Sequence, residues 1–156
     1  MPFIPGLISA STLIGAITAT KNDEKRQALF NYGEKIGTMF QIKDDLVDIT
    51  GLEREIGKPT MFDLKKNMLT LPIIYILSTK DKSKRKELIS HLKYLSKKKK
   101  KKEIKSMIIE MGGVEYAENK IKELSEQAIV DLNIFKDSEV KTALISAINF
   151  NMTRKL

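Results

Sequence analysis

Three aspartates, Asp44, Asp45 and Asp48, interrupt an otherwise apolar stretch of predicted helix. At 100° per residue, their carboxylates share an arc of roughly 100° with Gly37 and Gln41, while apolar side chains cover most of the remaining helix surface. Asp44 and Asp48 lie one turn apart, so their oxygens can converge on one hard cation. Mg2+ is the expected cation because it accepts few carboxylates and keeps positions for water and phosphate. Gly37, on the same face, is interpreted as leaving room for a ligand.

A solvated acidic patch at a helix end is the alternative interpretation of this stretch. The flanking apolar residues favour a cavity instead, because a helix that is apolar on most sides is expected to be buried. Unpaired carboxylates in such surroundings are strongly disfavoured, so something positive must meet them. The pattern therefore predicts that the three carboxylates face a cavity and that Asp44 and Asp48 bind a cation there.

Composition limits the classes of protein that the chain can represent. Its 156 residues fit one domain, residues 1–156, with room for a real core. The 28 Lys and Arg exceed the 20 Asp and Glu by eight, which favours anionic partners such as phosphorylated metabolites, nucleic acid or anionic lipid. No cysteine occurs, which excludes disulfides, thiolate metal sites and a cysteine nucleophile and fits a cytoplasmic protein.

The first twenty residues contain no charge, so a signal peptide or a membrane span must be considered. Neither fits, since there is no basic leader, prolines and glycines interrupt the segment, and its hydroxyl side chains make it too polar for a span. The helix expected over Gly6–Thr20 has apolar or small side chains around its whole circumference. We therefore predict a central helix that is buried on every side in a helical bundle.

Helical periodicity extends through the rest of the chain, and no strand pattern occurs, so the predicted fold class is all-α. A second helix is expected from a cap at Asn22 or Asp23 to about Thr50, with Gly51 as its stop. The other expected elements are a loop over Leu52–Phe62, a helix over Asp63–Leu77, a turn over Ser78–Arg85, a short amphipathic helix over Leu88–Leu95, a break at Gly112-Gly113, and helices over Val114–Leu132 and Val140–Met152.

Six consecutive lysines, Lys97–Lys102, interrupt this pattern. They repel one another and cannot all face a core, so a solvated linker or helix face is the expected role. Contact with an anionic membrane surface is the alternative that we retain. Nucleic acid is not an expected partner, because no aromatic residues are interleaved with the lysines. His91, the single histidine, has no second metal ligand or base near it in sequence and is expected to be structural or exposed.

The stretch Phe40–Asp48 resembles the second aspartate-rich motif of trans-polyprenyl diphosphate synthases. The resemblance covers nearly the whole chain through an ordered set of shorter matches at Gly15-Ala16, Tyr32-Gly33, Gly57-Lys58-Pro59, Asp63-Leu64, Thr70-Leu71-Pro72, Gly112-Gly113 and Tyr116-Ala117. It implies the C-terminal half of the isoprenoid synthase helical bundle. It also implies a prenyltransferase that uses Mg2+ to ionise an allylic prenyl diphosphate and adds isopentenyl diphosphate to it.

The resemblance also assigns roles residue by residue. Asp44, Asp45 and Asp48 match the second-motif magnesium ligands, which bind the metal directly or through water. Gln41 matches the glutamine near the allylic diphosphate. Lys58 matches the loop lysine that contacts diphosphate as the site closes, a role that suits a mobile point charge.

Three diphosphate-handling elements of the family have no counterpart here. The first aspartate-rich motif is absent, Phe3-Ile4 replaces an expected Lys-Thr pair, and Met68 replaces an expected lysine. One hypothesis is therefore a C-terminal half from a split or truncated synthase that is inactive alone. The other is a non-catalytic helical subunit or remnant that binds a related synthase, since the resemblance implies a family whose members form homodimers or heterodimers. A nucleic-acid-binding module is a distant third.

Overall fold

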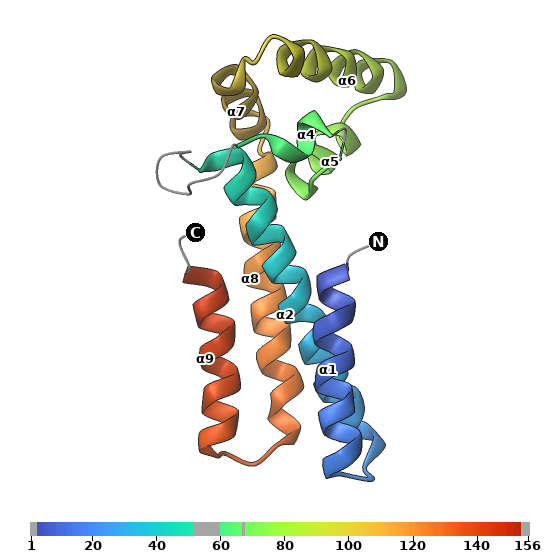
Figure 1. The fold of residues 1–156 in the computed structure, drawn as a ribbon, viewed down its shortest axis with the longest axis vertical. Coiled ribbons are helices and arrows are strands. Elements are labelled where there is room, and N and C mark those ends of the chain that lie inside the picture. The colour runs from blue at the N-terminus through green and yellow to red at the C-terminus, as the bar shows by residue number, and fades with distance from the viewer. Residues whose placement is uncertain (1–2, 52–59, 67, 154–156) are drawn as a thin grey trace. The chain divides into compact units, whose positions relative to one another are not determined.

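The computed structural model describes residues 3–51, 60–66 and 68–153, and helices with short turns account for this part of the chain. No strand occurs within these ranges, which agrees with the predicted all-α class (Figure 1). The helices are α1 (Phe3–Ala19), α2 (Asp23–Thr50), α4 (Phe62–Lys65), α5 (Leu71–Ser78), α6 (Lys82–Lys97), α7 (Lys101–Glu110), α8 (Gly113–Asp131), the 3-10 turn η1 (Leu132–Ile134) and α9 (Glu139–Thr153).

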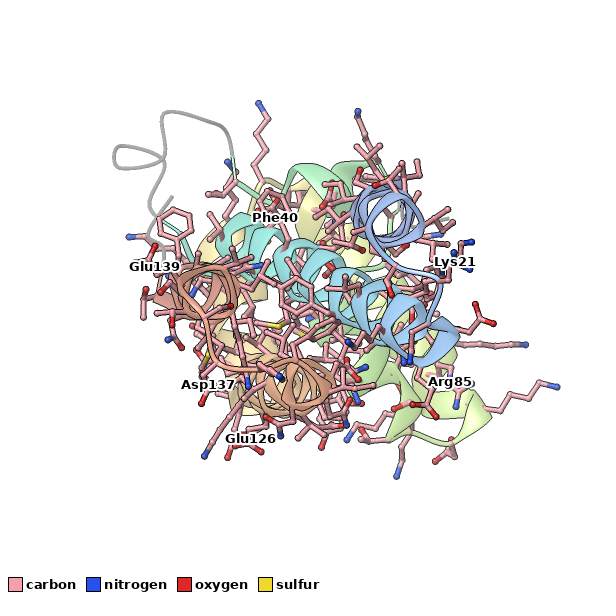
Figure 2. All side chains as sticks on the ribbon, turned by 90° about the horizontal axis from the view of Figure 1, so that it is seen from below. Lys21, Phe40, Arg85, Glu126, Asp137 and Glu139 are labelled. Carbon is pink, nitrogen blue, oxygen red and sulfur yellow. The ribbon has the colours of Figure 1, made fainter. Side chains whose placement is uncertain are left out.

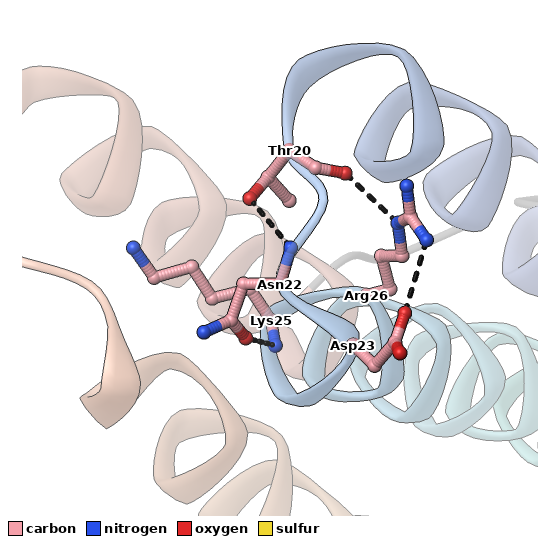
Figure 3. Close-up of polar contacts among 5 residues, drawn as sticks. All are labelled: Thr20, Asn22, Asp23, Lys25 and Arg26. Carbon is pink, nitrogen blue, oxygen red and sulfur yellow. Dashed lines mark hydrogen bonds and ion pairs between the residues drawn. The ribbon is translucent and has the colours of Figure 1, made fainter.

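The turn before α2 is fixed by side chains that the sequence supplies locally (Figure 3). Asn22 caps α2, because its Oδ1 accepts the N–H of Lys25 at 2.9 Å. The hydroxyl of Thr20 accepts the N–H of Asn22 at 3.1 Å, and Nε of Arg26 donates to the carbonyl of Thr20 at 2.8 Å. The guanidinium of Arg26 also pairs with Asp23 at 3.0 Å. Of the two caps considered from the sequence, Asn22 is therefore the one used.

Two predicted boundaries in the middle of the chain are wrong. The helix expected over Asp63–Leu77 is interrupted after Lys65 and begins again at Leu71, so Pro72 lies in a first turn, where its missing N–H costs no hydrogen bond. The turn expected over Ser78–Arg85 already contains the start of α6. Asp81 causes this early start, since its carboxylate accepts the N–H of Lys84 at 2.9 Å as an N-cap. Of the loop expected over Leu52–Phe62, residues 52–59 lie outside the described part of the chain.

The chain separates into two compact units. Among the described residues, the first contains α1, α2 as far as Lys43, and the chain from Lys120 to Thr153, and the second contains Asp44 to Asn119. Two helices, α2 and α8, contribute residues to both units. The chain predicted as a single domain over residues 1–156 thus comprises two compact units, and that they form one domain stays a prediction.

In the first unit, α9, which begins at Glu139 (Figure 2), packs on α2 through specific polar contacts. The hydroxyl of Tyr32 donates to the carbonyl of Leu144 at 2.9 Å, and the side-chain amide of Asn151 donates to the carbonyl of Ile36 at 3.2 Å. Tyr32 and Asn151 are both buried. These bonds fix the register of the two helices, since a buried polar group that loses its partner costs free energy.

On the other side of α2, two glycines allow the backbone of α1 to approach closely. A Cβ added at Gly33 would lie 2.8 Å from Cα of Ser9, and one added at Gly37 would lie 2.5 Å from Cα of Pro5. The interpretation of Gly37 as space for a ligand is therefore wrong, because the backbone of α1 occupies that space. Gly37 instead lets α1 and α2 pack closely, because it has no side chain.

We predict that Gly37→Ala lowers the free energy of unfolding by about 1–3 kcal/mol, because the new methyl group overlaps backbone that must shift. Gly15→Ala is the matched control. Gly15 also lies within a helix, but no heavy atom lies within 4 Å of an added Cβ there, so alanine should stabilise by up to about 1 kcal/mol. Urea denaturation measures both effects. Equal effects of the two substitutions would contradict the close packing at Gly37.

The helix predicted over Gly6–Thr20 needs neighbours on every side, and in the chain by itself only part of α1 is covered. Pro5, Ser9 and Ala16 are buried, whereas Leu7, Ile14 and Ile17 are 55%, 63% and 51% exposed. The exposed residues are spaced along one face of the helix, which we call the α1 apolar face. Within the described part of the chain, no helix is long and apolar enough to cross a membrane.

The second unit has its own hydrophobic core, and α6 and α7 close it with apolar residues on their inner faces. At the start of α8, Gly113 permits close packing, since an added Cβ would lie 2.7 Å from the carbonyl oxygen of Pro72. The rings of Tyr75 and Tyr116 stack with their centroids 4.1 Å apart. The core residues are Ile49, Met61, Leu64, Ile73, Ile76, Leu77, Leu92, Leu95, Ile104 and Ile108.

Burial raises the pKa of Tyr32 to about 12. The folded state therefore holds this proton more tightly than the unfolded state, so the associated stability is complete below pH 10 and is lost as the pH rises towards 12. Relative to Tyr32→Phe, the native chain should be about 1 kcal/mol more stable at pH 8, where its hydrogen bond is intact. This advantage should vanish by pH 12 in chemical denaturation series of both proteins. An advantage that is constant with pH would contradict the assignment.

Candidate functional site

The end of α2 places three carboxylates within the second unit. Asp44, Asp45 and Asp48 are each partly buried, while Leu46 and Ile49 on the same turns are almost fully buried. The alternation of acidic and apolar residues thus anchors this end of α2 in the core without burying the carboxylates completely. The arrangement agrees with the apolar helix and acidic stripe expected from the sequence.

Asp48 makes contacts with the segment that precedes α4. Its Oδ2 accepts the N–H of Asp63 at 3.3 Å, and its main-chain carbonyl accepts the N–H of Met61 at 2.9 Å. Met61 is buried and adopts φ +57°, a left-handed conformation that costs free energy for a residue other than glycine. Asp48 therefore accepts two hydrogen bonds that hold the strained segment at Met61 beside the acidic stripe.

Asp63 is a fourth carboxylate in this region. Its pKa is raised by burial, by the nearby charge of Asp48 and, more weakly, by that of Asp44, while Lys66 acts in the opposite direction. Asp44 and Asp48 on α2 thus act electrostatically on a carboxylate from α4. Such concentrated negative charge favours a bound cation, because like charges repel where solvent screens them incompletely.

Asp45 faces the start of α5. Its Oδ2 accepts the N–H of Leu71 at 3.3 Å, which satisfies one of the amide groups that a helix leaves unpaired at its N-terminus. The adjacent Thr70 is only 4% exposed, and its hydroxyl oxygen has no hydrogen-bond partner. This hydrogen bond holds the Thr70-Leu71-Pro72 segment against the aspartate-bearing helix.

The carboxylate oxygens at the end of α2 fit Mg2+ if water and substrate phosphate supply its remaining ligands. Among the described residues, no group of three or more His, Cys, Asp or Glu side chains could hold a metal ion by itself. Mg2+ does not need such a cage, because proteins commonly bind it through one or two carboxylates while water and substrate phosphate complete the octahedron. Asp44 and Asp48 supply hard oxygen donors one turn apart, so they are the residues that would hold the ion.

The other predicted site residues are distributed differently. Gln41 lies on α2 one turn before the aspartates and is partly buried, as expected from the helical pattern. Lys58 lies outside the described residues, so its role stays a prediction. Met68 is 47% exposed. His91 is exposed on α6, in agreement with its lack of a predicted catalytic role.

Two residues of this region were not predicted as site residues. Asp63 and Thr70 lie in segments far from Asp44 in the sequence, and only the fold brings them close to the aspartate-bearing end of α2. The signal that could have identified them is their position in the ordered matches Asp63-Leu64 and Thr70-Leu71-Pro72.

Residues 5–111 match the family model described as Polyprenyl synthetase. The short chain isoprenyl diphosphate synthase of Methanocaldococcus jannaschii is 40% identical over 112 residues, which are 71% of this chain and 34% of that protein. The heptaprenyl diphosphate synthase component 2 of Geobacillus stearothermophilus is 42% identical over 72 residues, which are 46% of this chain and 22% of that protein.

The solved structures agree with the sequence relatives. The geranylgeranyl pyrophosphate synthetase of Pyrococcus horikoshii superposes with a TM-score of 0.85 and 26% identity, covering 97% of this chain and 46% of that chain. The present chain therefore spans about a third of the M. jannaschii relative and about half of the solved structure. The helical arrangement is that of part of this fold, as the predicted fold class required.

Proposed function

Because the chain belongs to the polyprenyl synthetase family, we propose that it is the magnesium- and diphosphate-binding part of a prenyltransferase of isoprenoid biosynthesis. Its substrates in this proposal are an allylic prenyl diphosphate and isopentenyl diphosphate. The assembled enzyme lengthens the allylic chain by one isoprenoid unit, and the isolated chain is inactive.

The observation that carries this proposal is the concentration of carboxylates around Asp48. Asp44 and Asp48 both act electrostatically on Asp63, and the contacts of Asp48 hold the segment that leads into α4. Lys66 acts on Asp63 in the opposite direction, but burial and the two aspartates of α2 together outweigh it, so the pKa of Asp63 is raised.

Each site residue has a role that its chemistry permits. Asp44 and Asp48 hold the metal, and Asp45 orients the start of α5 through Leu71. Bound Mg2+ neutralises charge that develops on the diphosphate leaving group. Lys58 contributes a further positive charge to the diphosphate, and Gln41 donates a hydrogen bond on the same side of α2.

The proposal includes a protein partner. The α1 apolar face is exposed in the chain by itself, and such faces on helices are commonly covered by another subunit. One relative is named as component 2 of a heptaprenyl diphosphate synthase, which favours a hetero-oligomer with a related synthase chain. The assembly is proposed to work in the cytoplasm. The second candidate function, a non-catalytic subunit, would retain this surface but not the metal site.

Ligand-dependent melting tests the proposed site. Mg2+ together with geranylgeranyl diphosphate at one hundred times its Kd should stabilise the folded chain by about 2.7 kcal/mol, because the ligand binds the folded state preferentially. This corresponds to a rise in Tm of roughly 5–10 °C for a chain of this size. Asp44→Ala combined with Asp48→Ala should abolish the rise.

Glu118→Ala combined with Glu126→Ala is the matched control, since it also removes two exposed or partly exposed negative charges but lies on α8. It should leave the ligand-dependent rise unchanged. An equal rise in the two double variants would show that the diphosphate binds elsewhere and would refute the site.

A further inference from the structure

The positive charge of this protein is concentrated in the two helices α6 and α7 and the turn between them. Residues 82–110 contain 12 Lys and Arg but 3 Asp and Glu, a net charge of +9, whereas the whole chain carries +8. The remainder of the chain is therefore slightly acidic. We call this segment the basic hairpin, and its charge is independent of the carboxylates on α2.

The basic hairpin presents its lysines away from the core. Leu92 and Leu95 of α6 and Ile104 and Ile108 of α7 are buried in the second unit. At 100° per residue, Lys86, Lys93 and Lys97 fall within roughly 40° on another side of α6, and all three are exposed. Packing of the apolar stripe thus leaves a row of ammonium groups facing solvent.

The turn extends this row with lysines held in a defined backbone. Lys98 and Lys99 are exposed, and Lys99 adopts φ +56°, the left-handed conformation typical of a helix C-terminus. The N–H of Lys100 donates to the carbonyl of Leu95 at 3.0 Å and closes the turn (Figure 1). The run of lysines, for which the sequence predicted a solvated linker or helix face, thus forms the exposed turn between α6 and α7 and the adjoining helix ends.

Several lysines of the basic hairpin have no counter-charge among the described residues. Lys100 pairs with Glu103 at 2.7 Å, and the amine of Lys105 donates to the carbonyl of Thr50. Lys93, Lys97 and Lys98 form no ion pair with any residue in the described ranges. Unpaired ammonium groups this close together repel one another, so an anionic surface that binds them gains free energy.

The side chains favour a lipid surface over nucleic acid. Eleven of the twelve basic residues are lysines, and the one arginine, Arg85, donates to the carbonyls of Leu77 and Lys80. Nucleic-acid surfaces typically add arginine forks or several stacking aromatics, which this segment lacks. Tyr94, 57% exposed between Lys93 and Lys97, has the amphipathic ring that suits a membrane–water interface.

We infer that the basic hairpin binds the surface of an anionic lipid bilayer and holds the protein there peripherally. Lysines near such a surface contribute binding free energy additively, while the exposed ring of Tyr94 enters the headgroup region. The inference rests on the charge and exposure of α6, α7 and their turn. It does not depend on the proposed transferase activity, so the two can fail separately.

Vesicle flotation of the full chain tests this inference. Vesicles of phosphatidylcholine with about 30% phosphatidylglycerol should carry the protein at about 0.1 M salt, and about 0.5 M salt should release it because screening shortens the range of the attraction. The combined change Lys93→Gln, Lys97→Gln and Lys98→Gln should weaken binding on the order of a hundredfold, about fivefold for each lysine.

The combined change Lys21→Gln, Lys122→Gln and Lys136→Gln is the matched control, because it removes the same charge from exposed positions outside the basic hairpin. It should weaken binding less than tenfold, and far-ultraviolet circular dichroism should show that both variants are folded. Equal losses in the two variants, or equal binding to vesicles of phosphatidylcholine alone, would overturn the inference. Tighter binding to a fluorescent 20-nucleotide DNA than to anionic vesicles would overturn it in favour of nucleic acid.

Discussion

The purified 156-residue chain is expected to convert prenyl substrates at a rate near background. Breaking an allylic carbon–oxygen bond requires stabilisation of charge around the whole diphosphate, and removing one preorganised stabilising group typically costs on the order of a hundredfold to a thousandfold in rate. This chain contains one aspartate-rich stretch of the type Asp-Asp-x-x-Asp, and neither Met68 nor Phe3-Ile4 carries a charge. The losses are not additive, but together they should exceed the effect of any single substitution.

Reconstitution makes this expectation specific. The assay extracts product made from radiolabelled isopentenyl diphosphate with farnesyl or geranylgeranyl diphosphate and Mg2+. Co-expression with the unmatched part of the M. jannaschii relative should recover product, because it supplies the helices for which this chain has no counterpart. Met68→Lys should increase product further.

The side chain of Met68 is about half exposed, so a lysine there need not bury its charge. Leu69→Lys is the matched control at a neighbouring position with similar exposure, and it should not increase product. Rapid elongation by the purified chain alone would refute the requirement for a second part. No product after co-expression with Met68→Lys would favour the non-catalytic subunit.

In the reconstituted enzyme, Asp44→Asn and Asp48→Asn are each expected to lower kcat/KM on the order of a hundredfold to a thousandfold. Asparagine keeps the size and an oxygen acceptor but removes the charge that favours a bound cation. Thermal melting without ligand checks that both variants remain folded. Both substitutions reduce the negative charge that acts on the carboxylate of Asp63.

Two substitutions of Asp45 distinguish its structural role from its electrostatic role. Asp45→Ala removes the acceptor for the N–H of Leu71 and should destabilise the unliganded chain by about 1 kcal/mol, whereas Asp45→Asn keeps an acceptor and should destabilise it less. Thermal melting without ligand measures this difference, and kcat/KM measures the loss of charge. Equal destabilisation by Asp45→Ala and Asp45→Asn would contradict a stabilising role for the hydrogen bond between Asp45 and Leu71.

The sequence by itself determined the helical class, the limits of α2 and the acidic stripe at its end. These features depend on residues within a few turns of one another: the cap at Asn22, the stop at Gly51 and the four-residue spacing of Asp44 and Asp48. The break between α4 and α5 was missed, because the helical pattern over Asp63–Leu77 did not reveal where the chain would bend.

Only the tertiary structure decided which distant segments contact the glycine and the aspartates of α2. Gly37 lies on the acidic face by periodicity, yet the backbone of α1 at Pro5 fills its space, and Asp63 approaches Asp48 although fifteen residues separate them. An amphipathic pattern shows that a helix has an apolar or acidic face, but it does not specify what covers that face. The reason is physical: periodicity arises from local backbone geometry, whereas close contacts depend on how distant segments fill shared volume.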